Sequence, residues 1–233
     1  MAKFGMVMDV TKCNGCYNCF LACKDEFCGN DFPPYSASQP MTGHFWMRMV
    51  EKERGKYPKV KVAYTAIPCM QCEKSPCTEV CPVTATYHNE EGIVVVDYDQ
   101  CIGCRACMAA CPYGARTFDF GYTYAEQLPV FDGAVVGGKT AAGYEHASQE
   151  YGEAWKREGK HESPVGNVRK CHFCQHRIKD GILPACTTTC IGRATYFGDA
   201  NDSTSLVTEL INKPNVIRLK EELGTEPRVY YVV

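Results

Sequence analysis

The chain has 233 residues, a formal net charge of −2 and 17 cysteines. The near-neutral charge gives no support to binding of nucleic acid or of an anionic membrane surface, and no apolar run reaches the ~18–20 residues that span a bilayer. Met1-Ala2-Lys3-Phe4 leads straight into a strand-like segment, so we expect no signal peptide and no twin-arginine motif on this chain. The length allows one or two domains.

A first cysteine group follows the first predicted strand, which covers residues 4–10. The group has the spacing C-x2-C-x2-C-x3-C and consists of Cys13, Cys16, Cys19 and Cys23. In two-cluster bacterial ferredoxins, three cysteines with this spacing ligate one cluster and the fourth ligates its neighbour. Lys24 replaces the proline that usually follows and leaves the ligands intact. Cys28 fits no motif and is expected to be a free thiol.

The second and third cysteine groups lie close together in the middle of the chain. The prolines of residues 29–58 argue against a helix there, and a strand is predicted at 60–67. The second group, C-x2-C-x4-C-x3-C-P, consists of Cys69, Cys72, Cys77 and Cys81. A hairpin with strands at 85–89 and 92–96 is predicted between the two groups. The third group, C-x2-C-x2-C-x3-C-P, matches the ferredoxin signature and consists of Cys101, Cys104, Cys107 and Cys111.

A long segment without cysteine separates the third group from the fourth. A strand at 116–120 is expected to close the central module. Residues 121–167 then form an excursion in which 144–158 could be one polar helix. So long an excursion within a compact domain is usually functional or a partner contact, and an exposed surface insertion is the alternative.

The fourth group has the longer spacing C-x2-C-x11-C-x3-C and consists of Cys171, Cys174, Cys186 and Cys190. His172 and His176 lie inside it, but four thiolates already complete a ligand set, so we expect neither histidine to be a ligand. A strand at 195–198, a helix capped by Asp202 or Ser203 and a final strand at 229–233 are predicted after it.

Three kinds of site could explain so many cysteines: disulfides, zinc and iron–sulfur clusters. Disulfides are typical of small secreted domains. A structural zinc site usually takes two separated C-x2-C pairs rather than four cysteines within eleven residues. The fourth group alone could hold zinc, but the three groups before it favour a cluster there too. We therefore predict four 4Fe–4S clusters.

The fourth cysteine of each group decides how the clusters pair. If each group gives three cysteines to one cluster and its last to a partner, the central groups pair with each other and the outer groups pair across the whole chain. The predicted ligand sets are Cys13, Cys16, Cys19 with Cys190; Cys171, Cys174, Cys186 with Cys23; Cys69, Cys72, Cys77 with Cys111; and Cys101, Cys104, Cys107 with Cys81.

This pairing predicts an α+β fold of two ferredoxin-like modules, one inserted in the other. The outer module is split between 1–58 and 168–233, the inner module covers 59–120, and 121–167 is the excursion. Because the clusters occupy the module cores, stability is expected to depend on metal. We find no nucleotide fingerprint, no nucleophile-and-base signature and no open iron site, which predicts an electron-transfer protein rather than an enzyme.

Four cysteine groups in this order, with the long spacer in the fourth, resemble the iron–sulfur subunit of molybdopterin oxidoreductases of the dimethyl-sulfoxide-reductase superfamily. The resemblance covers essentially the whole chain. It implies a large catalytic subunit with a molybdenum or tungsten bis-pterin as partner, with a membrane anchor or a soluble electron donor as a possible further one. In the nitrate-reductase branch a tryptophan replaces one cysteine of the third group and gives a 3Fe–4S cluster; Cys104 stands there here, which implies four 4Fe–4S clusters.

Residues 43–47, 53–58 and 222–231 are similar to the small subunit of pyrogallol–phloroglucinol transhydroxylase, and the last of these also to that of respiratory arsenate reductase. These likenesses favour a reductase or dehydroxylase of a polyhydroxylated aromatic, with an arsenate-type or other anion reductase and a redox-neutral transhydroxylase as alternatives. A free-standing polyferredoxin carrier is the alternative of another class. We expect a chain that stays in the cytoplasm or is exported with a twin-arginine-bearing partner.

Overall fold

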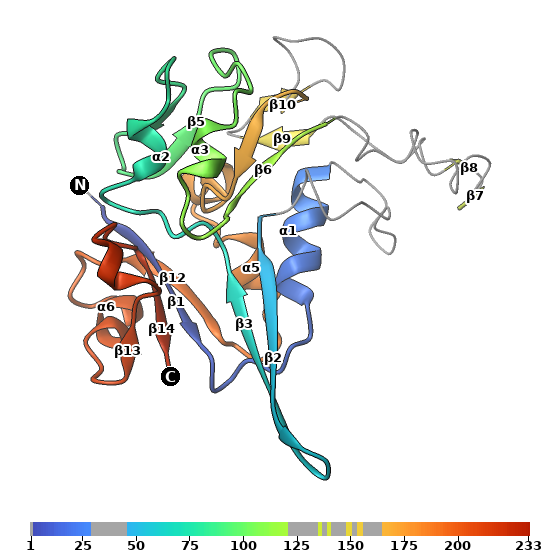
Figure 1. The fold of residues 1–233 in the computed structure, drawn as a ribbon, viewed down its shortest axis with the longest axis vertical. Helices are drawn as coiled ribbons and strands as arrows, with labels where there is room; N and C mark the ends of the chain where they lie inside the picture. The colour runs from blue at the N-terminus through green and yellow to red at the C-terminus, as the bar shows by residue number, and fades with distance from the viewer. Residues whose placement is uncertain are drawn as a thin grey trace.

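The computed structural model describes residues 2–28, 46–120 and 165–233, together with the backbone of four short strands between 120 and 165. Its largest sheet has the strand order β12-β1-β14-β13. The central strand β1 (Phe4–Asp9) pairs antiparallel with β12 (Thr195–Asp199) and parallel with β14 (Val229–Val232), which also pairs with β13 (Val216–Ile217). The first strand of the chain therefore lies between two strands from its C-terminal part (Figure 1).

One face of this sheet is covered by α6 (Leu206–Ile211), whose Val207 and Leu210 are buried with Val7. The predicted helix is confirmed, but the prediction of its cap is wrong. The Oγ of Ser205 accepts the backbone N–H of Val207 at 3.2 Å, whereas Asp202 accepts the N–H of Thr204 in the preceding turn. The cap lies closer to the first apolar residue than expected because Asp202 and Ser203 belong to the turn at 202–205 that precedes the helix.

The second and third cysteine groups lie around two short helices and three short strands. These are α2 (Pro76–Glu79), β4 (Thr86–His88), β5 (Val94–Val96), α3 (Ala106–Ala109) and β6 (Arg116–Phe118). The β4–β5 pair is the predicted hairpin, with Thr86 opposite Val96. β6 pairs antiparallel with β11 (Val168–Lys170), the strand that leads into the fourth cysteine group. This pair connects the central part of the chain to its C-terminal part.

Three helices carry or flank the outer cysteine groups. α1 (Asn18–Cys28) packs against α5 (Ala185–Thr188), and α4 (Gln175–Lys179) lies between the second and third cysteines of the fourth group. The N-terminal and C-terminal cysteine groups are therefore neighbours in space. Residues 29–45 and the side chain of Cys28 lie outside the described residues, so the prediction of a free thiol there is not tested.

A long hairpin extends beyond the rest of the described chain (Figure 1). It consists of β2 (Arg48–Lys56) and β3 (Lys59–Ile67), which pair in register from Arg48 opposite Ile67 to Lys56 opposite Lys59. The strand predicted at 60–67 is β3, while β2 was not predicted because the proline-rich composition of 29–58 obscured the strand at its end. The predicted module boundary at residue 58 falls at the turn of this hairpin.

One apolar core includes residues from all three parts of the chain, among them Phe27, Met70 and Phe173. The four cysteine groups thus lie around one common apolar core in a mixed α/β structure. The division into two nested modules remains a prediction. Among the described residues, no helix is long and apolar enough to cross a membrane.

The excursion between residues 121 and 164 contains two short strand pairs. β7 (Val135–Val136) pairs with β8 (Lys139–Thr140), and β9 (Ser148–Glu150) pairs antiparallel with β10 (Glu153–Trp155). Glu150 lies opposite Glu153, so paired extended backbone occupies the segment where the polar helix was expected. The helix predicted at 144–158 is therefore wrong.

Candidate iron–sulfur sites

A first cavity is lined by cysteines from both ends of the chain. Cys13, Cys16, Cys19 and Cys190 line it together with Met49, Tyr64 and Ala66 from the β2–β3 hairpin. Gly15 in the loop has φ +70°, and a Cβ there would lie 2.5 Å from the Tyr64 ring, so a glycine lets the loop turn tightly beneath the hairpin. Cys16 is exposed, which places one edge of this cavity at the surface.

A second cavity is more deeply buried and also joins the outer groups. Cys23, Cys171, Cys174 and Cys186 line it, with Phe27, Met47 and Phe173 completing its wall. The backbone N–H of Trp46 donates to the Cys23 sulfur and that of Phe173 to the Cys171 sulfur, each at 3.4 Å. Amide donors of this kind stabilise a reduced, more negative cluster.

The central groups are brought together as well. Cys72 lies close enough to Cys69, Cys77 and Cys111 for their charges to raise its pKa, although burial is the larger cause. Cys107 on α3 is similarly close to Cys77 and Cys101. Cys81 follows α2 and is half-buried, and Cys104 precedes α3 and is exposed. The helices α2 and α3, which adjoin the second and third groups, pack against each other.

The donor set fits an iron–sulfur cluster better than a single metal ion. The sixteen cysteines of the four groups are free, with no disulfide among them. Within the described ranges, no three His, Cys, Asp or Glu side chains converge closely enough to hold one metal ion. Four sulfurs spread around a cavity wall instead suit a polynuclear group ligated by Cys₄, as in 4Fe–4S sites.

The protonation state of two buried thiols indicates that they need a bound metal. Burial raises the pKa of Cys171 to about 11 and that of Cys23 to about 12. Without a bound cation both are therefore neutral thiols at pH 7. Only the thiolate is a metal ligand, so these sites need the positive charge of a bound metal to ionise the sulfurs and hold them in the core.

A buried cation lies between the second and third cysteine groups. Arg116 on β6 is buried, and its Nη1 donates to Thr86 Oγ1 at 3.2 Å. Burial alone lowers the pKa of Arg116, but the charges of Cys77 and Cys107 outweigh it, so the guanidinium stays charged. Its Nη2 has no hydrogen-bond partner in the described part of the chain. That group could donate to a cluster ligated by Cys77 or to one ligated by Cys107.

Lys170 and Gln71 occupy the junction between the second and fourth cysteine groups. The fully buried Lys170 ammonium donates to the carbonyl oxygens of Val94 and Cys171, the latter at 2.8 Å. The Gln71 amide donates to Cys171 O at 2.6 Å and accepts from Val94 N at 2.8 Å. Cys171 in turn lies near Cys69. The junction between the two sites is thus closely packed and fully hydrogen-bonded at these atoms.

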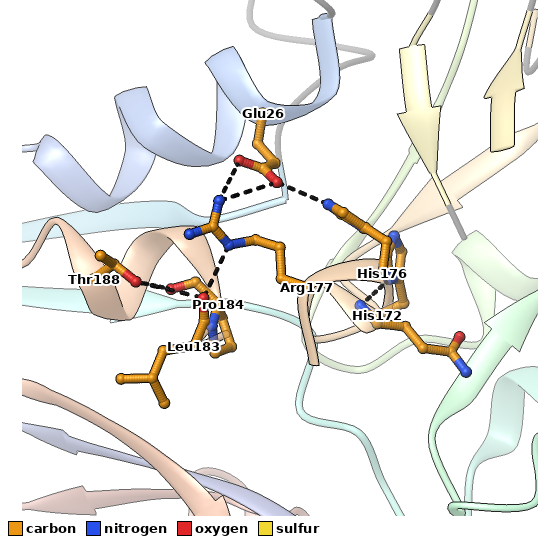
Figure 2. Close-up of polar contacts among 8 residues, drawn as sticks. Glu26, His172, His176, Arg177, Leu183, Pro184 and Thr188 are labelled. Carbon is orange, nitrogen blue, oxygen red and sulfur yellow. Dashed lines mark hydrogen bonds and ion pairs between the residues drawn. The ribbon is translucent and has the colours of Figure 1, made fainter. Parts of the chain in front are cut away.

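A polar clamp joins α1 to α4 (Figure 2). Glu26 accepts hydrogen bonds from His176 Nε2 at 2.7 Å and from Arg177 Nη1 at 3.1 Å, while Arg177 Nε donates to Leu183 O at 2.9 Å. Burial raises the pKa of Glu26, but the hydrogen bond from His176 and the charge of Arg177 outweigh it and the net shift is downward. The clamp fixes α1, which carries Cys19 and Cys23, against the fourth group.

The two histidines of the fourth group are held differently, and the prediction that neither is a ligand stays a prediction. His176 is committed to Glu26, and His172 is fully buried, with its Nδ1 accepting the N–H of Gln175 at 3.0 Å. His172 lines the wall of the second cavity beside Phe27. Burial lowers the pKa of His172 well below its usual value, so the imidazole is neutral.

Sequence reasoning missed the polar and charged residues around the cysteine groups. Arg116, Lys170 and Gln71 have no motif, and each is placed by a strand or loop next to a cysteine that lies far away in sequence. The only signal available was the presence of polar and charged residues directly beside predicted buried segments. The positions of the sixteen cysteines in groups, by contrast, followed from spacing alone.

Comparisons with known proteins agree with this arrangement. The 4Fe-4S dicluster domain family matches residues 60–127 and 132–200. The chain is 52% identical over 228 residues to a subunit of the selenate reductase of Mesobacillus selenatarsenatis, an alignment that covers 97% of this chain and 70% of that protein. It is 34% identical to the arsenate respiratory reductase iron-sulfur subunit of Shewanella sp. (strain ANA-3), with 99% and 96% covered.

A further relative is the pyrogallol hydroxytransferase small subunit of Pelobacter acidigallici, 30% identical over 99% of this chain and 69% of that protein. The alignments with these three relatives cover 97–99% of this chain rather than one ferredoxin motif. These relatives are named as subunits of enzymes, and the predicted electron-transfer role is confirmed. This chain belongs to the family of iron–sulfur subunits of dimethyl-sulfoxide-reductase superfamily oxidoreductases, which carry 4Fe–4S dicluster domains and have no catalytic centre of their own.

Proposed function

We propose that this chain conducts electrons between a donor and a molybdopterin catalytic subunit along four 4Fe–4S clusters in a row. One observation carries the proposal: each of the two outer cavities is lined by cysteines from opposite ends of the chain, in the combination that cluster ligation requires. The proposed ligand sets are Cys13, Cys16, Cys19 and Cys190; Cys23, Cys171, Cys174 and Cys186; Cys69, Cys72, Cys77 and Cys111; and Cys81, Cys101, Cys104 and Cys107.

The order of the clusters follows from the cysteines that adjoin one another. Cys19 and Cys23 lie one turn apart on α1, which puts the first cluster beside the second. Cys171 of the second cluster lies near Cys69 of the third, so these two clusters are neighbours. Cys77 of the third cluster lies near Cys107 of the fourth, so these two are neighbours as well. The two exposed ligands, Cys16 and Cys104, belong to the clusters at the two ends of this row. Electrons would therefore enter at one exposed end and leave at the other.

The substrate belongs to the catalytic subunit, and we propose an oxyanion of the selenate or arsenate kind. The support is the 52% identity to a selenate reductase subunit and the 34% identity to an arsenate reductase subunit. A polyhydroxylated aromatic is the second candidate, supported by the 30% identity to the pyrogallol hydroxytransferase small subunit. Activity of the isolated complex with selenate, arsenate and pyrogallol, each with a reduced viologen dye, separates the candidates.

The ligand assignment predicts that Cys13 and Cys190 act on one cluster although 177 residues separate them in sequence. Cys13→Ser and Cys190→Ser are each expected to change the same electron paramagnetic resonance signal, whereas Cys111→Ser changes a different one. The wild-type chain should hold about sixteen irons and sixteen acid-labile sulfides, four of each per cluster. Loss of two different signals from Cys13→Ser and Cys190→Ser would show that the pairing is wrong, and zinc without sulfide would exclude the clusters.

The buried Arg116 predicts a tuned reduction potential for the two clusters of the central cysteine groups. A permanent cation beside a cluster favours the reduced, more negative form. Arg116→Met should therefore lower the potential of at least one of these two clusters by about 59 mV or more, a tenfold change for a one-electron couple. Arg116→Lys keeps the charge and should shift the potential less, and the peripheral Arg218→Met should leave it unchanged. Redox titration followed by electron paramagnetic resonance measures these shifts; equal potentials in wild type and Arg116→Met would contradict the role.

A further inference from the structure

We propose that the β2–β3 hairpin is a docking arm whose basic face binds an acidic surface of the catalytic subunit. This inference rests on the proposed function, because it takes the large subunit as the partner. The arm extends away from the remaining described residues, and Figure 1 shows its end projecting beyond the rest of the ribbon. A two-stranded hairpin alone is marginally stable in water, so an arm of nine residue pairs benefits from a surface to lie on.

The two faces of the arm differ strongly in charge. Alternate residues of a strand share a face, and residues directly opposite each other on paired strands do too. By the register of the hairpin, one face carries Arg48 at its base, five further cations and no acid. We call these five the basic face; they are Lys52, Arg54, Lys56, Lys59 and Lys61. All five are exposed, in a chain whose net charge is only −2.

The basic face is electrostatically unfavourable in the free chain. Arg54 lies directly opposite Lys61, and Lys56 directly opposite Lys59. Like charges directly opposite one another destabilise a strand pair. The side chain of none of the five forms an ion pair or a hydrogen bond with another described residue. An acidic partner surface would relieve this repulsion, so the charge pattern fits binding better than it fits folding of the free chain.

The tip of the arm adds an apolar anchor. Tyr57 is 93% exposed and Val60 is 49% exposed. Exposed aromatic residues of this kind are enriched among the side chains that dominate protein interfaces. The combination of one aromatic anchor with flanking cations fits a groove in a protein with acidic walls.

The position of the arm favours a protein partner over a membrane or a nucleic acid. The face opposite the basic face holds the base of the arm against the first cysteine cavity, which Met49, Tyr64 and Ala66 line. On the same face, Glu51 accepts a hydrogen bond from Tyr17 OH. Any protein that exchanges electrons at the exposed Cys16 must therefore approach beside the arm. The opposite face carries Glu51 and Glu53, which would oppose an anionic lipid or nucleic acid surrounding the arm but can be accommodated in a protein groove.

The test is charge reversal on the basic face. The complex is purified through an affinity tag on this chain, and its dissociation is followed by size-exclusion chromatography over increasing salt. Lys52→Glu/Lys61→Glu should bind the large subunit at least tenfold more weakly and lose much of the salt dependence, because rim charges act mainly through long-range attraction. Tyr57→Ala should weaken binding with the salt dependence kept. The matched control is Lys179→Glu/Lys213→Glu, which reverses two exposed lysines away from the arm and should bind as wild type.

Iron content, sulfide content and the electron paramagnetic resonance signals of the unbound variants show whether weaker binding comes from the arm or from loss of a cluster. The inference is supported if Lys52→Glu/Lys61→Glu keeps all four clusters and loses the large subunit. It is overturned if that variant binds with wild-type affinity and salt dependence, or if it loses binding only to vesicles with anionic lipid or to duplex DNA. Absence of a molybdopterin subunit from the wild-type complex would overturn the proposed function itself, and this is read before any variant is compared.

Discussion

Removal of iron is expected to unfold most of this chain. Eight of the ligand cysteines are buried, and several belong to the main apolar core with Phe27, Met70 and Phe173. Loss of the clusters leaves cavities in this core, where Cys23 and Cys171 are neutral thiols. A single large-to-small change in a core costs about 2–5 kcal/mol, and a domain is stable by only about 5–15 kcal/mol. The combined loss therefore exceeds the stability available.

The measurement is anaerobic chelation of iron followed by near-ultraviolet circular dichroism and limited proteolysis. We expect the aromatic dichroism to vanish and the whole chain to become protease-sensitive, with both restored by ferrous iron and sulfide. Zinc alone should not restore them, because one ion cannot bridge four sulfurs spread around a cavity wall. A metal-free chain with native dichroism and a cooperative thermal transition would contradict the dependence on clusters.

The sequence allowed the cysteine groups and most regular elements to be predicted, because both depend on local spacing. The strands at 4–9, 59–67 and 229–232 and the β4–β5 hairpin lie close to where alternation of apolar residues placed them. The cluster type followed from four cysteines within eleven residues. These features need no knowledge of which segments meet in space.

The features that were missed depend on long-range contacts. Nothing local indicates that β1 lies parallel to β14, more than 200 residues away, or that Arg116 approaches Cys77 and Cys107. The basic face was missed for a related reason. Its charges are mixed with Glu51 and Glu53 in sequence, and only the pairing of β2 with β3 separates the two signs onto opposite faces.

Asp119→Ala is expected to be the most damaging substitution away from the cysteines. Asp119 Oδ2 and Arg169 Nη1 lie 2.7 Å apart, and both side chains are fully buried. The pair spans the junction of β6 with β11, where Asp119 also exchanges backbone hydrogen bonds with Gly166 and Asn167. Removal of one partner of a buried ion pair leaves an uncompensated charge and costs about 3–5 kcal/mol. Loss of this ion pair should weaken the pairing of β6 with β11, which connects the central part of the chain to its C-terminal part.

Two controls identify the buried charge as the cause. Asp119→Ala/Arg169→Met removes both charges and should recover much of the loss, since buried pairs can often be replaced by apolar residues at little cost. Glu221→Ala breaks a surface pair with Arg218 and should cost no more than about 1 kcal/mol. Urea-induced bleaching of the clusters reports the midpoint and the rate of unfolding. If Asp119→Ala unfolds with the midpoint of Glu221→Ala, the ion pair does not hold β6 to β11, and the backbone pairing of the two strands must suffice.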